Sequence, residues 1–186
     1  MLSLIFVLKS YWHGLLIIDK ESINSHMDTF TDEQWMRHAL ALALKADASN
    51  EVPVGAVIVR EGIIIGEGFN QPISSNDPSA HAEIVALRDA GQAVDNYRFL
   101  GATMYVTVEP CAMCAGAIIH SRITRLVYAA SEPKAGAVCS HFQLFDQPQM
   151  NHKVVWLGEV LTGEASSILQ AFFARRRDEK KRERRG

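Results

Sequence analysis

Hydrophobic positions recur with two different periods along the chain, and the change of period predicts a mixture of helices and strands. The segment Thr31–Gln34 has the pattern of a capping box, and apolar residues with helical spacing follow it to about Ser49–Asn50. The β-branched runs 52–59 and 63–69 flank the turn dipeptide Glu61-Gly62. We therefore expect one helix and then a β-hairpin.

The rest of the chain alternates between helical and extended patterns. We expect a loop at 70–79, a helix from about Ala80 to Ala90 that Gly91 ends, a strand at 103–108, a helix from Pro110 to about His120, a strand at 125–129, an irregular stretch at 131–152, a strand at 154–157 and a last helix from Leu161 to about Arg182. A hairpin followed by alternating helices and strands predicts an α/β fold with three layers, α/β/α, around a central mixed five-stranded sheet.

The first residues do not fit this pattern. Residues 1–26 hold two short apolar runs, and neither approaches the roughly 20 residues needed to span a bilayer. They also lack the basic start and small-residue cleavage site of a secretory signal. We expect residues 1–26 to be an appendage outside the fold, residues 27–186 to form one domain, and the protein to have no membrane partner.

Composition adds two points to this picture. The 186 residues are 48% hydrophobic with a net charge of −2, which suits a single domain with a core. Residues 175–185 hold eight Lys or Arg and three acids, so the last helix ends in a local charge of +5. Such an end either contacts an anion or is simply solvated.

Two short segments contain the residues that could perform chemistry: His81-Ala82-Glu83 and Pro110-Cys111-Ala112-Met113-Cys114. Both fall in the first turn of an expected helix, where the backbone dipole favours a thiolate. One imidazole and two thiolates suit Zn²⁺, and three protein ligands leave a position for water, as catalytic zinc sites do. We expect one zinc ion per subunit, held by His81, Cys111 and Cys114. Glu83 is close enough to transfer protons without being a ligand.

Each of these residues also has a simpler interpretation. A Cys-x-x-Cys pair alone could be a redox pair or half of a structural zinc site. Three cysteines do not look like a disulfide framework, and they favour a reducing, cytoplasmic environment. The third, Cys139, has no expected partner and could be a packing residue or a free thiol. Further histidines lack the spacing of a fourth ligand: His120, His141 and His152.

The motif His81-x-Glu83 followed by Pro110-Cys111-x-x-Cys114 resembles the signature of the zinc nucleobase deaminases. The resemblance extends from about Thr31 to Arg177. Within the cytidine/deoxycytidylate deaminase superfamily, the sequence is most similar to the bacterial tRNA-specific adenosine deaminases. The segments that carry this similarity are Glu51–Ala56, Gly66–Asn70, Asp77–Ile84, Val108–Gly116, Lys134–Gly136 and Phe172–Phe173.

The resemblance implies a cytidine-deaminase-like fold, a homodimer and hydrolysis of adenosine to inosine at the wobble position (34) of a tRNA, expected to be an arginine tRNA. It implies that Glu83 is the catalytic acid and base and that Asn70 hydrogen-bonds the base. It further implies that Ala82, Glu109 and Pro110 line the pocket through backbone groups. A C-terminal helix from about residue 161 is implied to bind the anticodon stem-loop, and the RNA contacts expected on this basis are Lys134, Phe172, Phe173, Arg176 and Arg177.

Two features refine the RNA prediction. Phe172 and Phe173 are adjacent on a helix and point about 100° apart, so one is expected in the core and the other is free to stack on a base. The family has an aspartate ahead of its Lys-x-Gly motif, whereas this chain has Glu132-Pro133 there. That difference bears on RNA specificity and not on deamination.

Two other functions stay open at this point. A deaminase of free guanine, cytosine or a nucleoside would use the same zinc site, but it would not need a basic, aromatic C-terminal helix. A non-catalytic zinc module that binds RNA or protein would have no use for Glu83 beside an open coordination position.

Overall fold

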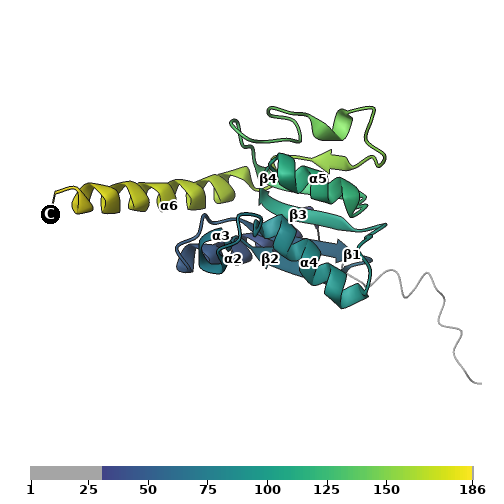
Figure 1. Cartoon of the computed structure of the whole chain (residues 1–186), viewed down its shortest axis with the longest axis horizontal. Helices are drawn as coiled ribbons and strands as arrows, with labels where there is room; N and C mark the ends of the chain where they lie inside the picture. The colour runs from purple at the N-terminus through teal and green to yellow at the C-terminus, as the bar shows by residue number, and fades with distance from the viewer. Residues whose placement is uncertain (1–30, 186) are drawn as a thin grey trace, which may run out of the picture.

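A mixed five-stranded sheet forms the centre of the computed structural model, which describes residues 31–185 (Figure 1). Its strands are β1 (Gly55–Arg60), β2 (Ile63–Phe69), β3 (Thr103–Val108), β4 (Arg125–Ala130) and β5 (Val155–Leu157), in the order β2-β1-β3-β4-β5. Strand β1 is antiparallel to β2 and to β3, while β3, β4 and β5 are parallel. The predicted mixed sheet is confirmed, and the expected appendage at 1–26 lies outside the described residues.

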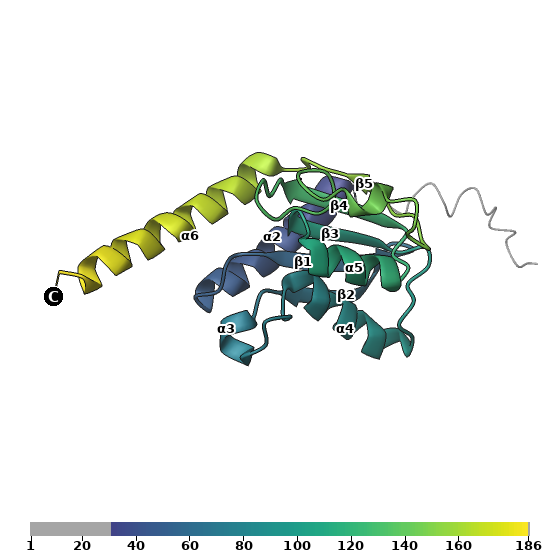
Figure 2. The same ribbon diagram turned by 45° about the horizontal axis from the view of Figure 1, so that its top comes forward.

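Helices cover both faces of the sheet, which confirms the three-layer α/β/α prediction (Figures 1 and 2). On one face lie α2 (Asp32–Ala48) and the first turns of α6 (Thr162–Glu183), and on the other lie α4 (Ala82–Val94) and α5 (Ala112–His120). The alternation along the strands explains this arrangement, because Val57 and Val59 are buried against α2 while Ala56 and Ile58 are buried against α4 and α5. The remainder of α6 projects from the body of the molecule.

The start of α2 is fixed both locally and by the sheet. The Thr31 hydroxyl accepts a hydrogen bond from the Gln34 amide and the Gln34 side chain accepts one from the Thr31 amide, so the predicted capping box is present. Asp32 receives two hydrogen bonds of 2.7 Å from the Arg125 guanidinium on β4 and one of 2.9 Å from the Tyr105 hydroxyl on β3. These contacts tie α2 to the middle of the sheet.

Two predicted helix ends were wrong. Gly91 does not end its helix, which continues to Val94 and stops at Asp95, the residue that takes up the left-handed conformation (φ 48°). Pro110 is not the first residue of α5, which starts at Ala112 with Cys111 as its N-cap. The Pro110 carbonyl accepts a hydrogen bond from the Ala137 amide, 2.8 Å away, and this contact keeps the backbone extended past the proline.

Other boundaries moved by a few residues. The strand expected from Val52 starts only at Gly55, because Pro53 has no N–H to donate and the Val54 amide bonds back to the Val52 carbonyl. The expected loop 70–79 contains the single-turn helix α3 (Pro72–Ser75), and the irregular stretch 131–152 contains a 3-10 turn at Leu144–Asp146. No helix within residues 31–185 is both long and apolar enough to cross a membrane.

Candidate active site

The amino ends of α4 and α5 meet on the same face of the sheet, and each begins with one of the predicted metal ligands. His81 is the N-cap of α4 and Cys111 is the N-cap of α5, both with extended backbone. Glycine on the neighbouring strand allows α4 to sit this close, because a Cβ at Gly68 would lie 2.3 Å from the Ala82 carbonyl oxygen. The two helix dipoles therefore direct their positive ends into one site.

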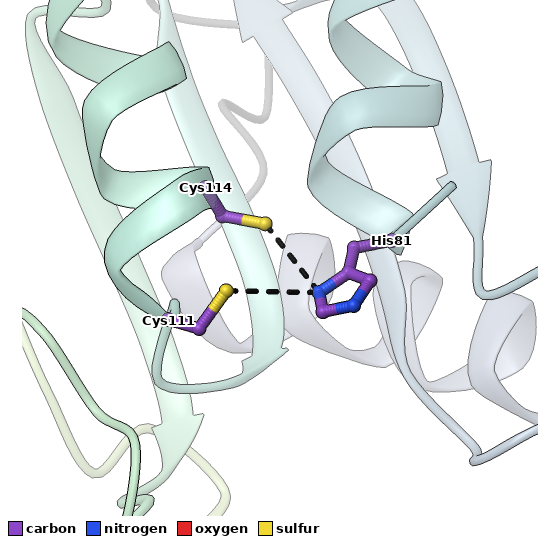
Figure 3. A group of neighbouring side chains, drawn as sticks. All are labelled: His81, Cys111 and Cys114. Carbon is purple, nitrogen blue, oxygen red and sulfur yellow. Dashed lines mark hydrogen bonds between the residues drawn. The ribbon is translucent and has the colours of Figure 1, made fainter. Parts of the chain in front are cut away.

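His81, Cys111 and Cys114 converge as the sequence predicts (Figure 3). The Nδ1 atom of His81 lies 3.7 Å from Sγ of Cys111 and 3.6 Å from Sγ of Cys114. Ligands at ordinary Zn–N and Zn–S distances in a tetrahedron are about 3.6 to 3.8 Å apart, so the three atoms fit a zinc ion. Among residues 31–185 they form the one group of His, Cys, Asp and Glu side chains arranged to hold a metal.

The electrostatics of the two thiols favour metal binding. A hydrogen bond from the Cys114 thiol lowers the pKa of Cys111 to about 4, and the neighbouring His81 acts in the same direction. The pKa of Cys114 is raised, because it holds the shared proton and is buried. The hydrogen bond between His81 and Cys111 raises the pKa of His81. These contacts favour a thiolate at Cys111, and a divalent cation would displace the proton held by Cys114.

Glu83 lies in the first turn of α4, beside the ligands. Its side chain is 4% exposed, and burial raises its pKa to about 7. Glu83 does not belong to the group of candidate metal ligands. A buried carboxylic acid next to a three-ligand site is suited to accept and return protons, as the sequence predicts.

A cavity of 330 Å³ opens beside the metal ligands, a size typical of small-molecule sites. His81, Cys111 and Glu83 form one wall of it. The remaining lining residues come from the α2–β1 connection, the segment after β2 that includes the start of α3, the end of β3, the 131–140 loop and α6. They are Val52, Val54, Asn70, Pro72, Val108, Glu109, Glu132, Ala135, Leu169 and Phe173. The cavity is therefore lined by apolar side chains together with a few polar ones.

Of the four predicted substrate contacts, Asn70 and Glu109 line the cavity, whereas Ala82 and Pro110 do not. Asn70 is 8% exposed, and its Oδ1 accepts a hydrogen bond of 2.9 Å from the Ala82 amide. Because this bond fixes the plane of the amide, the Nδ2 donors are held in one orientation at the cavity. The Pro110 carbonyl is used by the Ala137 amide, as described above.

The predicted RNA contacts are distributed over two regions. Phe172 is 4% exposed and belongs to the buried hydrophobic residues, while Phe173 is 45% exposed and lines the cavity. The expected difference in burial between the two rings is therefore observed. Arg176 and Arg177 are exposed on the next turn of α6, where Arg176 pairs with Glu179 at 3.0 Å. Lys134 is exposed in the 131–140 loop, and none of these three basic residues lines the cavity.

The residues set aside at the sequence level mostly lie as expected. His120, His141 and His152 are not part of the ligand group. Cys139 is a free cysteine, but the expectation that it has no partner was wrong, because its Sγ lies 2.8 Å from the Tyr128 hydroxyl. That contact joins the 131–140 loop to β4.

The sequence did not predict the side chains of several cavity residues as part of the site. Val52 and Val54 lie in the segment Glu51–Ala56 that carries the family resemblance, but nothing in that segment assigned their side chains to the cavity. Leu169 is an ordinary apolar residue of α6 and reaches the cavity through packing. The role of the Glu109 side chain was also missed, since only its backbone was expected to matter. The position of Glu109 directly before the Pro-Cys-x-x-Cys motif was the feature of the sequence that could have indicated a role for its side chain.

Comparisons with known proteins agree with this geometry. The cytidine and deoxycytidylate deaminase zinc-binding region matches residues 29–130. The tRNA-specific adenosine deaminase of Haemophilus influenzae is 55% identical over 151 residues, which cover 81% of this chain and 87% of that protein.

Two solved structures extend the comparison. One comes from a study of A-to-I editing by tRNA A34 deaminases at the wobble position of transfer RNA, with a TM-score of 0.71 and 43% identity over 73% of this chain and 98% of the other. The other is the guanine deaminase of Bacillus subtilis, with a TM-score of 0.55 and 34% identity over 78% of this chain and 95% of the other.

Proposed function

Because the chain belongs to the cytidine and deoxycytidylate deaminase family, and within it to the tRNA-specific adenosine deaminases, we propose that it hydrolyses adenosine to inosine at the wobble position of a tRNA. The observation that carries the proposal is a single cavity lined by His81 and Cys111 of the ligand group, by the buried Glu83 and by the exposed ring of Phe173. The first two provide for deamination, and the third provides for binding of a base in a single-stranded loop.

The chemistry follows from the positions of the residues. Zinc held by His81, Cys111 and Cys114 would act as a Lewis acid that makes a water molecule more acidic. Glu83 takes a proton from the attacking water and gives one to a ring nitrogen while the C–O bond forms at C6 of adenine. Glu83 then protonates the amine as the C–N bond breaks. The products are inosine and ammonia, so water and adenosine are fully accounted for.

Orientation of the base falls to Asn70 and to the apolar walls. The Asn70 amide is fixed by the Ala82 amide, so its Nδ2 can donate to an acceptor on the base without reorganisation. Val52, Val54 and Val108 provide apolar contacts for the ring. Excluding water from this cavity strengthens the polar contacts within it.

Recognition of RNA is assigned to α6 and the 131–140 loop. Phe173 would stack on a base next to the target, and the basic turns after it would follow the backbone of the anticodon stem-loop. These turns carry a cluster of four cations, Arg177, Lys180, Lys181 and Arg184. Lys134 is exposed in the 131–140 loop, which supplies Glu132 and Ala135 to the cavity wall. We propose the anticodon stem-loop of an arginine tRNA as the substrate and the cytoplasm as the site of action.

We further propose that the protein is a homodimer, as the family resemblance implies. An apolar hollow of 390 Å³ between α4 and α5 supports a second copy there, and Ile84, Leu87, Tyr97 and Ala117 are among its lining residues. Met113 on α5 is also exposed, at 40%. Sedimentation equilibrium of the zinc-loaded protein should give twice the chain mass.

A free-base deaminase is the second candidate, favoured by the similarity to guanine deaminase and by a chemical site with nothing specific to RNA. Zinc-loaded protein is incubated with an anticodon stem-loop carrying adenosine at the wobble position and, separately, with free adenosine, adenine, guanine, cytosine and cytidine. Inosine in the RNA alone supports the proposal. Turnover of a free base with inert RNA supports the second candidate, and zinc binding without turnover of any substrate indicates a binding module.

A further inference from the structure

The carboxylate of Glu109 is the acceptor for an unusual number of hydrogen bonds. Glu109 is the residue after the last residue of β3, and it is 3% exposed. Oε1 accepts from the amides of Val138, Cys139 and Ser140 at 3.1, 2.8 and 2.9 Å. Oε2 accepts from the Glu132 amide at 3.1 Å and from the Ser140 hydroxyl. Four backbone amides and one hydroxyl therefore point at one carboxylate.

All five donors belong to one segment, residues 132–140, which folds back over the start of α5. Gly136 pairs with Cys111 in an isolated antiparallel bridge, and the Ala137 amide bonds to the Pro110 carbonyl at 2.8 Å. There is no space between the carboxylate and the segment, since a Cβ at Gly136 would lie 2.4 Å from Oε2. The segment supplies Glu132 and Ala135 to the cavity wall.

An ionised carboxylate is required for this arrangement. Each carboxylate oxygen accepts more than one hydrogen bond, whereas an amide has one accepting oxygen and an NH₂ that only donates. A glutamine at this position could keep its oxygen at the Oε1 site, but its NH₂ would then face the Glu132 amide. A donor that faces a donor is left without a partner, and the segment must shift to relieve the contact.

We propose that Glu109 is a positioning residue whose carboxylate fixes segment 132–140 as a wall of the cavity and so sets the affinity for the target nucleotide. This inference rests on the proposed function for its kinetic part. Within residues 31–185, Glu109 has no hydrogen bond to the three metal ligands or to Glu83. Its loss should therefore affect binding of the substrate more than the chemical step.

The test compares zinc-loaded wild-type protein with Glu109→Gln, Glu109→Asp and the control Ser140→Ala, which removes one of the five donors and leaves the four amides. We expect Glu109→Gln to keep one zinc per chain and to show faster amide hydrogen exchange in peptides covering 132–140 only. We expect its KM for the stem-loop to rise about tenfold or more, with kcat within about threefold of wild type. Glu109→Asp should have an exchange rate in 132–140 and a KM between those of wild type and Glu109→Gln. Ser140→Ala should have wild-type values of both.

Several outcomes would overturn the proposal. Unchanged exchange in 132–140, an unchanged KM, loss of zinc in Glu109→Gln, or failure of both Glu109 variants to fold would each assign a different role to the residue. The exchange measurement needs no RNA substrate. Wild-type protein that makes no inosine in RNA would therefore refute the proposed function, while the exchange result would still decide whether Glu109 holds the segment.

Discussion

The adjacent rings of Phe172 and Phe173 allow the contribution of α6 to the core and its proposed contribution to RNA binding to be separated by two neighbouring substitutions. Phe172 is 4% exposed, so nearly all of its roughly 200 Å² leaves water on folding. At about 25 cal/mol per Å² that burial stabilises the fold by at most roughly 5 kcal/mol, and Phe→Ala changes in cores cost about 3–5 kcal/mol. Phe173 is 45% exposed, so the same change there should cost about half as much.

Binding of RNA should show the opposite order. Stacking of one base on an aromatic ring contributes about 1–3 kcal/mol, which corresponds to a rise of about 5- to 150-fold in KM when the ring is lost. Phe173→Ala should therefore raise KM for the anticodon stem-loop by that factor. Phe172→Ala should mainly lower the free energy of unfolding, although its ring packs edge-on against Phe173 at 5.4 Å between centroids.

The assay pairs urea unfolding of each zinc-loaded variant with steady-state inosine formation below its unfolding transition. Phe173→Leu is the matched control, because it keeps apolar volume at the cavity but removes the aromatic face. It should retain most of the stability and share the rise in KM. A wild-type KM in Phe173→Ala, or equal losses of stability in the two alanine variants, would refute the assignment of Phe173 to RNA.

Three further predictions concern the chemistry, the metal and the pH dependence of stability. Glu83→Gln should lower kcat by about 10²- to 10⁴-fold while zinc content and stem-loop affinity stay at wild-type values, and a variant with normal turnover would remove Glu83 from the mechanism. Cys114→Ser should lose zinc, as measured by metal analysis. It should also lose the stabilisation that bound zinc gives the wild-type protein, which is about 4 kcal/mol when free zinc is at a thousandfold excess over its Kd. A chelator should therefore lower the Tm of the wild-type protein but not that of the variant. The Arg125 hydrogen bonds hold the pKa of Asp32 below its ordinary value of 3.8, so this carboxylate stabilises the fold fully above that pH and progressively less as the pH falls through its lowered pKa. Asp32→Asn should flatten the acid limb of unfolding free energy against pH, and an unchanged limb would contradict the reasoning.

The fold was largely predictable because both periodicities are strong in this sequence. The run 52–59 is apolar on both sides of the strand, as expected for a strand covered by helices on two faces, and the capping box at Thr31 marks the start of α2. Errors occurred where a distant contact decides a boundary. Local propensity favours a helix at Pro110, but a hydrogen bond from Ala137, 27 positions further on, keeps that backbone extended.

The candidate metal ligands and the acid beside them were predictable for a related reason. These residues, His81, Glu83, Cys111 and Cys114, lie in two short segments, and their types alone indicate a metal with an open position. The separation of Phe172 from Phe173 also follows from helix geometry without any knowledge of the partner surface. What could not be predicted was which ring faces the cavity.

By itself, then, the sequence determined the layers of the fold, the ligand set and the acid beside it, because these depend on local spacing and on the chemistry of single side chains. Only the tertiary structure decided the walls of the cavity and the groups that hold them. Val52, Leu169 and Glu132 lie in three separate parts of the chain and meet only when the sheet and helices pack. The carboxylate of Glu109 could be recognised as the anchor of residues 132–140 only there, because its donors follow it by 23 to 31 positions and no local rule links them.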